Sequence, residues 1–442
     1  MPPGLATAFC FLAIATFFFL DRDKARVSVA LLIPILWLSI CASRTVGQWL
    51  EGRVGAEASS SELEEGSSFD ASVFAGLALA GFSVLIRRRR QVVKVLRANG
   101  PLLCFFLYCA VSVCWSDFPM TAFKRWIKAT GDLAMVLVVF TDPRPRAAMR
   151  RFLTWPGFVL LPLSILLIRY YPTLGRGWSE WTGEAYNVGV ATGKNGLGYV
   201  CLIFGLGSFW CILSTIRRGF KEHSRRTLLA NAAVLTLAFY LFHLADSATS
   251  LGCLVFGGVV MLLASRPTMR RNRVLIHSLV AFVLLLVLVA LFLMPSLGLT
   301  AAVGRDSSLT GRTRIWSIVL PLAVNPVFGA GYESFWLGPR LNQIWVANGQ
   351  HLNQAHNGYL EVYLDLGWVG LILVGTVLIW GYRNAIQAVR RAPALGSLQL
   401  AFLVVAVIYN FTEHAFRELH PVWIMFLLAV VNLPLQLRQE FE

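Results

Sequence analysis

Apolar residues occur along this chain in long runs that short polar stretches separate. A helix that crosses the hydrocarbon core of a bilayer needs about 20 mainly apolar residues, within a range of about 17–25. The runs therefore predict an all-α polytopic membrane protein with about twelve or thirteen transmembrane helices. The candidate segments are 4–20, 27–43, 71–86, 99–116, 126–141, 152–169, 196–215, 227–245, 248–265, 274–294, 368–382, 398–412 and 420–437.

Six short connections between these segments are basic and hold 25 of the 39 Lys and Arg residues. Cytoplasmic loops of membrane proteins carry an excess of these residues. We therefore expect the basic connections inside, the N-terminus outside and the C-terminus inside, and we interpret the arginine runs as topology signals rather than ligand sites. The connections are 21–26, 87–97, 142–151, 217–226, 266–273 and 383–391.

The composition supports lipid as the main solvent of the chain. Hydrophobic residues make up 57% and charged residues 14%, whereas soluble domains carry about 25% charged residues. The net charge of +16 lies in the connections, which argues against a nucleic-acid partner. The eight cysteines lie inside apolar segments without a CxxC pair or a Cys/His cluster, so we expect neither a disulfide framework nor a structural zinc site.

The loops on the expected outer side differ in character. Residues 44–70 are acidic and rich in Ser and Gly, which is typical of a floppy excursion. Residues 295–367 form the longest connection, and a structureless loop of that length is uncommon and usually functional. Its Trp, Tyr and Pro residues at turn-like spacings predict short helices across the outer face. The chain thus divides into an N-terminal bundle (1–294), a large outer loop (295–367) and C-terminal helices (368–442).

The large loop opens with a motif that carries arginine. In "SSLTGRTRIW" (307–316), Thr310 is a plausible N-cap, and Arg312 and Trp316 share a helix face because they are four residues apart. Downstream, Gly329 and Gly331 in "NPVFGAGYESFW" predict a break and a tight return.

The same loop ends with "NQAHNGYLEVYLDLGW" (353–368). We expect a helix from about Asn357, on which Asn357, Glu361 and Asp365 share one face that points outward. His356 directly precedes it. Taken alone, an interfacial histidine caps a helix and an interfacial arginine contacts a headgroup. Together in one loop they suggest chemistry, because arginine matches phosphate oxygens and histidine can remove a proton near neutral pH.

Two further motifs place cations on the expected outer side. "ATGKNGLG" (191–198) is not a phosphate-binding P-loop, because the glycine spacing differs and Asn195 stands where Ser or Thr is required. Lys194 either snorkels from a turn or helps to form an anion site at a helix N-terminus. "WSDFPMTAFKRWIKATGD" (115–132) adds Arg125 with two lysines, which an anionic lipid headgroup would explain.

These motifs in this order resemble the O-antigen ligase and polymerase superfamily over roughly residues 100–380, with the exopolysaccharide polymerases of the succinoglycan type as the closest members. The resemblance implies a helical membrane bundle with a large periplasmic loop. It also implies metal-independent, inverting transfer of a glycan from an undecaprenyl-diphosphate carrier to an acceptor sugar, at the periplasmic face of the bacterial inner membrane.

The resemblance also assigns roles to residues. The motif match gives His356 the role of the base for the acceptor hydroxyl, and Arg312 that of a diphosphate contact. Ligases carry another basic residue at the turn before the large loop, whereas here that turn reads "DSATS" (246–250). The departure mildly favours a polymerase. We therefore expect the second phosphate contact among Lys194, Arg314 and Arg125; Asn357 and Glu361 are further candidate substrate contacts.

The expected partners are the carrier-linked glycan, the bilayer and other components of polysaccharide export, and we expect no cofactor. The loop histidines, His351 and His356, are five apart and do not have zinc spacing, although a divalent ion could still bind through the diphosphate. The alternative is a transporter or flippase for lipid-linked sugars, which would place ionisable residues at mid-membrane depth. A third interpretation is a non-catalytic scaffold.

Overall fold

The computed structural model describes residues 1–21, 26–52, 66–178, 183–217, 219, 222–296, 308–349 and 351–441. Most of the acidic stretch that we expect to be floppy, residues 53–65, lies outside the described residues. Helices dominate the described chain, and its two strands form one antiparallel hairpin. The predicted fold class, an all-α polytopic membrane protein, is confirmed.

The N-terminal elements alternate long helices with short surface pieces. They are α1 (Pro3–Leu20), η1 (Val29–Leu31), α2 (Leu32–Cys41), α3 (Val46–Glu51), α5 (Ser68–Arg87), α6 (Arg89–Arg97), α7 (Gly100–Ser112), η2 (Val113–Trp115), α8 (Pro119–Phe140), α9 (Pro145–Tyr170), α10 (Pro172–Gly175), β1 (Arg176–Trp178) and β2 (Ala185–Asn187). Gly177 of β1 lies opposite Tyr186 of β2.

The remaining elements precede, form and follow the large outer loop in sequence. They are α11 (Lys194–Arg217), α12 (Glu222–Ala245), α13 (Ala248–Ala264), α14 (Pro267–Arg271), α15 (Arg273–Ser296), α17 (Ser308–Val319), η3 (Leu320–Leu322), α18 (Gly338–Asn348), α19 (Gly358–Arg391), α20 (Pro393–Tyr409), α21 (Pro421–Val430) and α22 (Leu435–Gln439).

Each of the thirteen apolar segments overlaps a helix. Within the described chain, six helices are long and apolar enough to cross a membrane, a bent pair of α6 with α7 and η2 makes a seventh, and five apolar helices are shorter. The segment 420–437 is shorter than we expect. Its helix, α21, ends at Val430, and the chain then leaves helical geometry before Pro434, which cannot lie inside a regular helix without breaking a hydrogen bond.

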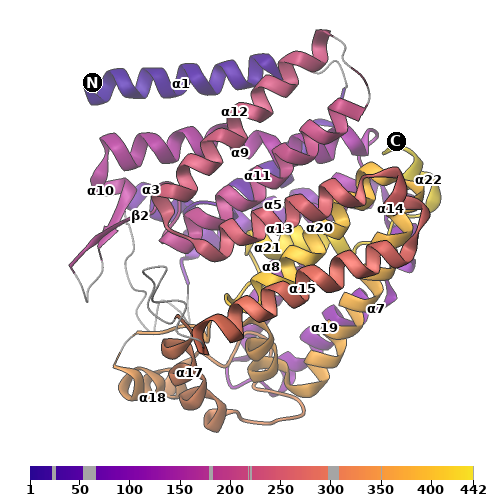
Figure 1. Ribbon diagram of the computed structural model, residues 1–442. Coiled ribbons are helices and arrows are strands. Elements are labelled where there is room, and N and C mark those ends of the chain that lie inside the picture. Colours follow the sequence, from indigo (N-terminus) through magenta and orange to yellow (C-terminus); the bar gives the residue numbers. More distant parts are fainter. Residues whose placement is uncertain are drawn as a thin grey trace.

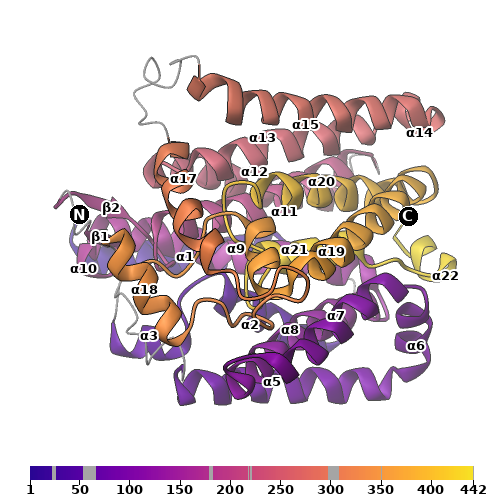
Figure 2. The same cartoon turned by 90° about the horizontal axis from the view of Figure 1, so that it is seen from below.

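The surface pieces collect at the two ends of the bundle. Figure 2 shows α6, α14 and α22, which belong to the basic side, at the right-hand end of the helices. The short helix α3, the hairpin, α17 and α18 lie at the opposite end, which Figure 1 shows at the left and lower left. The chain therefore separates its basic connections from its large loop, as the alternation of charge predicts.

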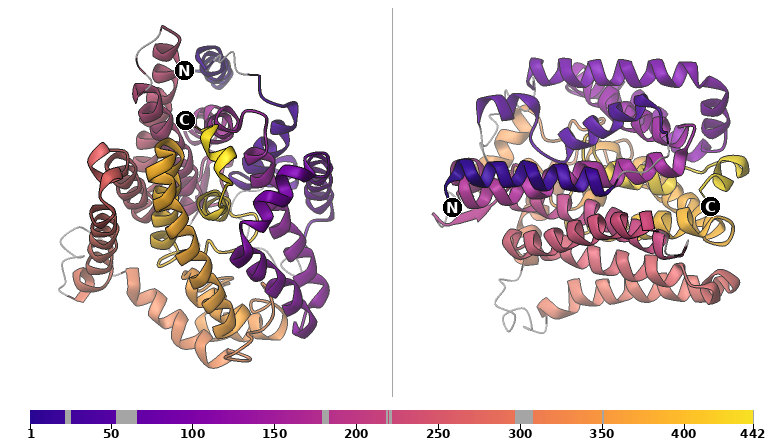
Figure 3. Two further views of the ribbon diagram at one scale, coloured as in Figure 1. Left: turned by 90° about the vertical axis from the view of Figure 1, so that its right-hand side faces the viewer. Right: turned by 90° about the horizontal axis from the view of Figure 1, so that it is seen from above.

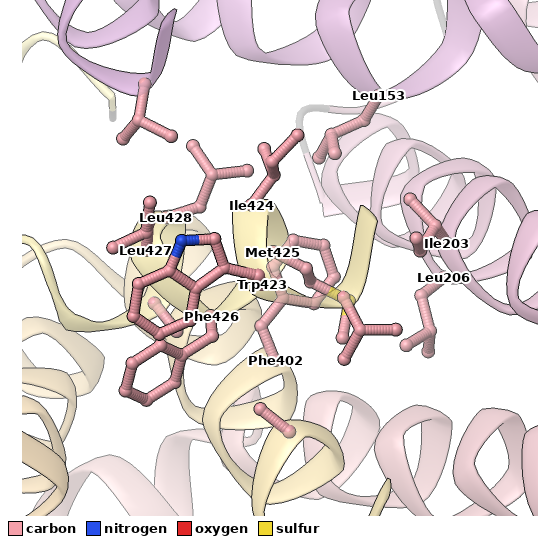
Figure 4. Close-up of a cluster of buried hydrophobic side chains, with 14 of the residues drawn as sticks. Leu153, Ile203, Leu206, Phe402, Trp423, Ile424, Met425, Phe426, Leu427 and Leu428 are labelled. Carbon is pink, nitrogen blue, oxygen red and sulfur yellow. The ribbon is translucent and has the colours of Figure 1, made fainter. Parts of the chain in front are cut away.

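The short helix α21 is the centre of the core. All ten of its residues are buried, and the yellow C-terminal helices lie in the middle of the bundle in Figure 3 (left). Side chains from three other helices surround it in Figure 4: Leu153 of α9, Ile203 and Leu206 of α11, and Phe402 of α20. The segment that leads into α21 is therefore fixed by the best-packed part of the protein.

Candidate active site

The large outer loop has a hydrophobic core of its own. Ile315 and Val319 of α17 pack with Leu341 and Ile344 of α18 and with Phe335 between them. The burial of these side chains explains why the described part of the loop, 308–349 and 351–367, folds into short helices, as predicted. The helix α17 begins at Ser308, so Thr310 lies within its first turn and is not the N-cap.

Glycines join the loop to a break in α19. Gly329, Gly331 and Gly367 all have positive φ values, and Gly367 interrupts the helix. Before the break, the carbonyls of Leu364 and Asp365 accept hydrogen bonds from the N–H groups of the loop residues Ala330 and Gly331, respectively. After the break, the N–H groups of Trp368 and Val369 donate to the carbonyls of Pro326 and Val327, respectively. The loop thus pairs the backbone groups that the break releases, as a broken helix within a membrane protein requires.

Glu361 and Asp365 anchor the loop from inside. Both are buried, so the expectation that their face of the helix points outward is wrong. The Glu361 carboxylate accepts hydrogen bonds from the Trp336 indole at 2.6 Å and from the Ala355 N–H. Asp365 accepts from the N–H groups of Ser334 and Phe335, both at 2.9 Å. These donors make burial of the carboxylates tolerable, and they use the helix face that we expected to contact substrate.

His356 lies between two tethered neighbours. The Trp316 indole of α17 donates to the carbonyl of Ala355 at 2.9 Å, and the side chain of Asn357 caps α19 by accepting from Tyr359 and Leu360. Asn357 is therefore a helix cap. His356 itself has a φ of 51°, which is uncommon outside glycine. Such backbone strain often occurs at functional sites.

The carboxylate of Glu413 joins the two residues that the motifs single out. Arg312 Nη2 donates to Glu413 Oε1 at 3.4 Å, and Asn195 Nδ2 donates to the same oxygen at 3.1 Å. His356 Nδ1 lies 3.5 Å from Oε2. Burial lowers the pKa of the Arg312 guanidinium, and Glu413 opposes that shift. The structure thus brings His356 and Arg312, which are 44 residues apart in sequence, to one acidic group.

The segment 410–420 between α20 and α21 supplies Glu413, and sequence reasoning missed it. Its letters, "NFTEHAFRELH", place five ionisable residues between two apolar runs, and that density was the available signal. The Gly358 N–H donates to the carbonyls of both Asn410 and Glu413. This contact holds the start of α19, and with it His356, against the segment.

A cavity of about 900 Å³ opens beside Glu413. Its lining residues come from two sets of elements, which we call the first and the second wall: the start of α11 with the end of α20 and segment 410–420, and the hairpin with the end of α12. In one wall, Asn195 bonds to Glu413. In the other, Asn187 of the hairpin donates to the carbonyl of Leu244 at the end of α12. The first wall contributes Lys194, Asn195, Tyr199, Tyr409, Glu413, His414, Arg417 and His420, and the second contributes Trp178, Glu184, Tyr186, Asn187 and Asp246.

The cations that we expect on the outer face differ in their contacts. Lys194 and Arg417 line the cavity, and neither forms a hydrogen bond or ion pair with the described residues. Arg314 is exposed and is absent from the lining. Arg125 donates to the carbonyl of Glu333. Of the expected second phosphate contacts, the structure thus places only Lys194 at the cavity, and it adds Arg417.

His414, which lines the cavity, lies close to two carboxylates. His414 Nε2 lies 3.7 Å from Glu333, and His414 Nδ1 lies 3.8 Å from Glu361. Burial lowers the pKa of His414 well below the usual value for histidine. Burial also raises the pKa of Glu333 well above the usual value for glutamate. At neutral pH His414 is therefore a neutral side chain that can form hydrogen bonds but carries no charge for an anion.

One buried carboxylate in the helices positions this site. Asp132 of α8 accepts from the Trp37 indole at 2.7 Å and from the Leu419 N–H at 2.9 Å. Leu419 has a φ of 57°, so its strained backbone is held by a side chain from the core. Asp132 thus supports segment 410–420 rather than a passage through the membrane.

Among the described residues, no group of three or more His, Cys, Asp or Glu side chains is arranged to hold a metal ion. Metal independence of the chemistry stays a prediction.

Comparison with known proteins identifies relatives in polysaccharide synthesis. Residues 232–375 match a family described as "O-Antigen ligase". The exopolysaccharide production protein ExoQ of Rhizobium meliloti (strain 1021) is 26% identical over 293 residues, which are 64% of this chain and 64% of that protein. A putative polysaccharide ligase of Rickettsia felis is 21% identical over 365 residues, 80% of this chain and 85% of that protein. The match to ExoQ thus spans less than two thirds of its length.

Proposed function

We propose that the chain is a polysaccharide polymerase or ligase, and the match of residues 232–375 to the O-antigen ligase family supports this proposal. In this proposal it transfers a glycan from an undecaprenyl-diphosphate carrier to an acceptor sugar, at the outer face of the bacterial inner membrane. The observation that carries the proposal is the convergence of His356, Arg312 and Asn195 on Glu413. Asn195 and Glu413 line the large cavity, whereas His356 and Arg312 contact Glu413 but are not among the lining residues.

In the proposed reaction, His356 takes the proton of the acceptor hydroxyl. Glu413 faces Nδ1 of His356, so it favours the tautomer that carries its proton on Nδ1 and leaves Nε2 free as the base. The acceptor oxygen then forms a bond to the anomeric carbon, the bond from that carbon to the diphosphate oxygen breaks, and the electron pair leaves with the diphosphate. Attack from the face opposite the diphosphate inverts the anomeric centre.

The diphosphate is already a good leaving group, so its departure needs little acid catalysis. It needs positive charge nearby to stabilise the negative charge that it gains. Lys194 and Arg417 line the wall that contains Glu413, and Arg312 reaches the same carboxylate from α17. Cations that are in place before the reaction stabilise the charge that develops on the leaving oxygens without reorganisation. We assign Arg417 and Lys194 to direct diphosphate contact and Arg312 to a contact that Glu413 orients. No step of this scheme requires a metal ion.

The second wall suits a sugar. Trp178 is 68% exposed yet lines the cavity, and the C–H face of a sugar ring stacks well on an indole. Glu184 and Asn187 provide carboxylate and amide groups for hydroxyls on the same wall. We place the acceptor glycan here and the diphosphate at the first wall, which contains Lys194 and Arg417.

The Trp178→Ala variant tests this placement. We expect the acceptor concentration at half-maximal velocity to rise roughly two- to tenfold, which is the scale of one aromatic stacking contact, with a small change in kcat. Trp368→Ala is the matched control, because Trp368 is also exposed but does not line the cavity. Equal effects of the two substitutions on that concentration would remove the acceptor from this wall.

The lipid-linked glycans of a strain that lacks the gene test the function itself. A polymerase predicts that single repeat units accumulate on the carrier, and a ligase predicts that long unligated polymer accumulates. The wild-type gene should restore the normal profile, whereas a His356→Gln gene should not. An unchanged profile in the deletion strain would refute both forms of the proposal, and repeat units held on the cytoplasmic side would indicate a flippase.

Labelling of introduced cysteines tests the proposed orientation. In a cysteine-free background, Ala347→Cys on α18 and Gln91→Cys on α6 place thiols at exposed positions near opposite ends of the bundle. The excess of Lys and Arg near α6 predicts that a membrane-impermeant reagent labels only Ala347→Cys in intact cells. Both should react after permeabilisation. Labelling of only Gln91→Cys in intact cells would reverse the topology.

A further inference from the structure

A second cavity, of about 710 Å³, shares no lining residue with the first. It is lined in part by α14, which Figure 2 shows at the basic end of the bundle. Two stretches that are far apart in sequence form it. The first runs from α14 into the start of α15, and the second is the end of α19. One proline, one glutamine and five arginines line the cavity: Pro267, Arg270, Arg271, Arg273, Gln387, Arg390 and Arg391.

The arginines of this cavity lack acidic partners. None of the five forms an ion pair with the described residues, and no Asp or Glu of the described chain is among the lining. Arg438 of α22 lies close by as well. Burial, and then the charge of Arg391, lowers the pKa of Arg438. The cavity therefore gathers like charges that repel one another unless an anion joins them.

The positive-inside rule explains why these residues are basic but not why they share a cavity. Arg89 and Arg90 of α6 belong to the same basic side but lie outside this cavity. By contrast, Gln387, Arg390 and Arg391 share one face of α19 because they are three and four residues apart. That face meets the arginines of α14 across the cavity. The positive-inside rule alone would be met equally well by arginines that point away from one another into water.

We propose that this cavity binds a phosphate ester, and that the phosphate belongs to the headgroup of an anionic phospholipid. Guanidinium groups bind phosphate oxygens in pairs, and basic pockets between helices on the cytoplasmic side suit anionic headgroups. Val274 and Leu275, next to Arg273, are exposed apolar side chains at 67% and 40%, so acyl chains can lie against the same end of α15. The inference does not depend on the proposed glycan transfer.

Lipid binding to the purified protein in detergent tests the inference. Native mass spectrometry would count bound phosphatidylglycerol during titration, with phosphatidylcholine as the neutral lipid. We expect the double variant Arg270→Gln/Arg390→Gln to bind phosphatidylglycerol at least about tenfold more weakly, since it loses two charge-assisted contacts. The control Arg89→Gln/Arg90→Gln removes two charges from the same side of the membrane, outside the cavity, and should bind like the wild type.

A thermal-stability titration separates the two sources of phosphate. Phosphatidylglycerol should raise the Tm of the wild type and of the control variant but not that of the cavity variant, whereas inorganic phosphate at the same concentration should leave all three unchanged. A rise with inorganic phosphate that only the cavity variant loses would assign the site to a soluble phosphate compound and overturn the lipid assignment. Equal loss of phosphatidylglycerol binding in both double variants would overturn the site, because general charge would then explain the binding.

Discussion

Substituting His356 with Gln is expected to abolish glycan transfer while leaving the amount of folded protein in the membrane unchanged. Glutamine keeps a hydrogen-bonding side chain of similar size but cannot take up the acceptor proton. The loss of a general base typically costs about 10²–10⁴ in rate. The histidine side chain is 26% exposed and contacts Glu413 only at 3.5 Å, so its removal should cost little stability.

Transfer of a carrier-linked glycan by purified protein, measured at equal protein concentration, is the assay for His356→Gln. His351→Gln is the matched control, because His351 lies in the same loop and its ring packs on Trp345 rather than on Glu413. Near-normal transfer by His356→Gln would reject the base assignment and leave His356 with a structural role only.

The same assay tests whether Glu413 acts through His356. Glu413→Gln keeps the size of the side chain but removes the charge that orients the imidazole, and it should lower kcat strongly. If the two residues act as one unit, the double variant should be no slower than His356→Gln alone. Losses that multiply in the double variant would show that Glu413 works independently of His356, for example by holding Arg312 or Asn195.

Much of the fold could be predicted because lipid imposes a simple rule on the chain. Runs of apolar residues have to form helices in a bilayer, and every run in this chain overlaps one. What could not be predicted was how each run ends. The last run stops at Val430 within the core, because its boundary depends on local breaks such as Pro434 and not on mean hydropathy.

The residues of the candidate site also fall into those that local sequence could predict and those that depend on the fold. His356 and Arg312 could be selected because their motifs are local and one loop contains both. The density of ionisable residues marks segment 410–420 in the sequence, but the roles of Glu413 and Arg417 could not be predicted, since these come from the packing of that segment against α19 and α11. Glu361 shows the opposite error. Helical spacing placed Glu361 and Asp365 on one face, but the expectation that this face points outward was wrong, because Trp336 and Ala355 donate to Glu361 from the folded loop.

Replacing Arg417 with Ala is expected to lower transfer by about 10²–10³, the usual cost of losing one group that stabilises developing charge. Arg417 is half-buried in the cavity wall and forms no hydrogen bond or ion pair with the described residues, so the substitution should leave the protein folded. Arg417→Lys keeps the charge but loses the planar fork, and its activity should lie between those of Ala and the wild type. The measurement is the rate of transfer from a carrier-linked donor.

Arg314→Ala is the control for Arg417→Ala, because it shows whether the loss of any nearby cation lowers the rate of transfer. Arg314 lies on α17 two residues after Arg312, but it is exposed and, unlike Arg312, forms no hydrogen bond or ion pair with Glu413, so its loss should change the rate by less than about threefold if only surface electrostatics is affected. Should Arg314→Ala prove as damaging as Arg417→Ala, the diphosphate would have to reach the exposed face of α17. The first wall of the cavity would then not include all the residues that bind the carrier. A strong loss with Arg417→Ala and a mild one with Arg314→Ala would instead fix the diphosphate between Arg417, Lys194 and Glu413, within reach of the base.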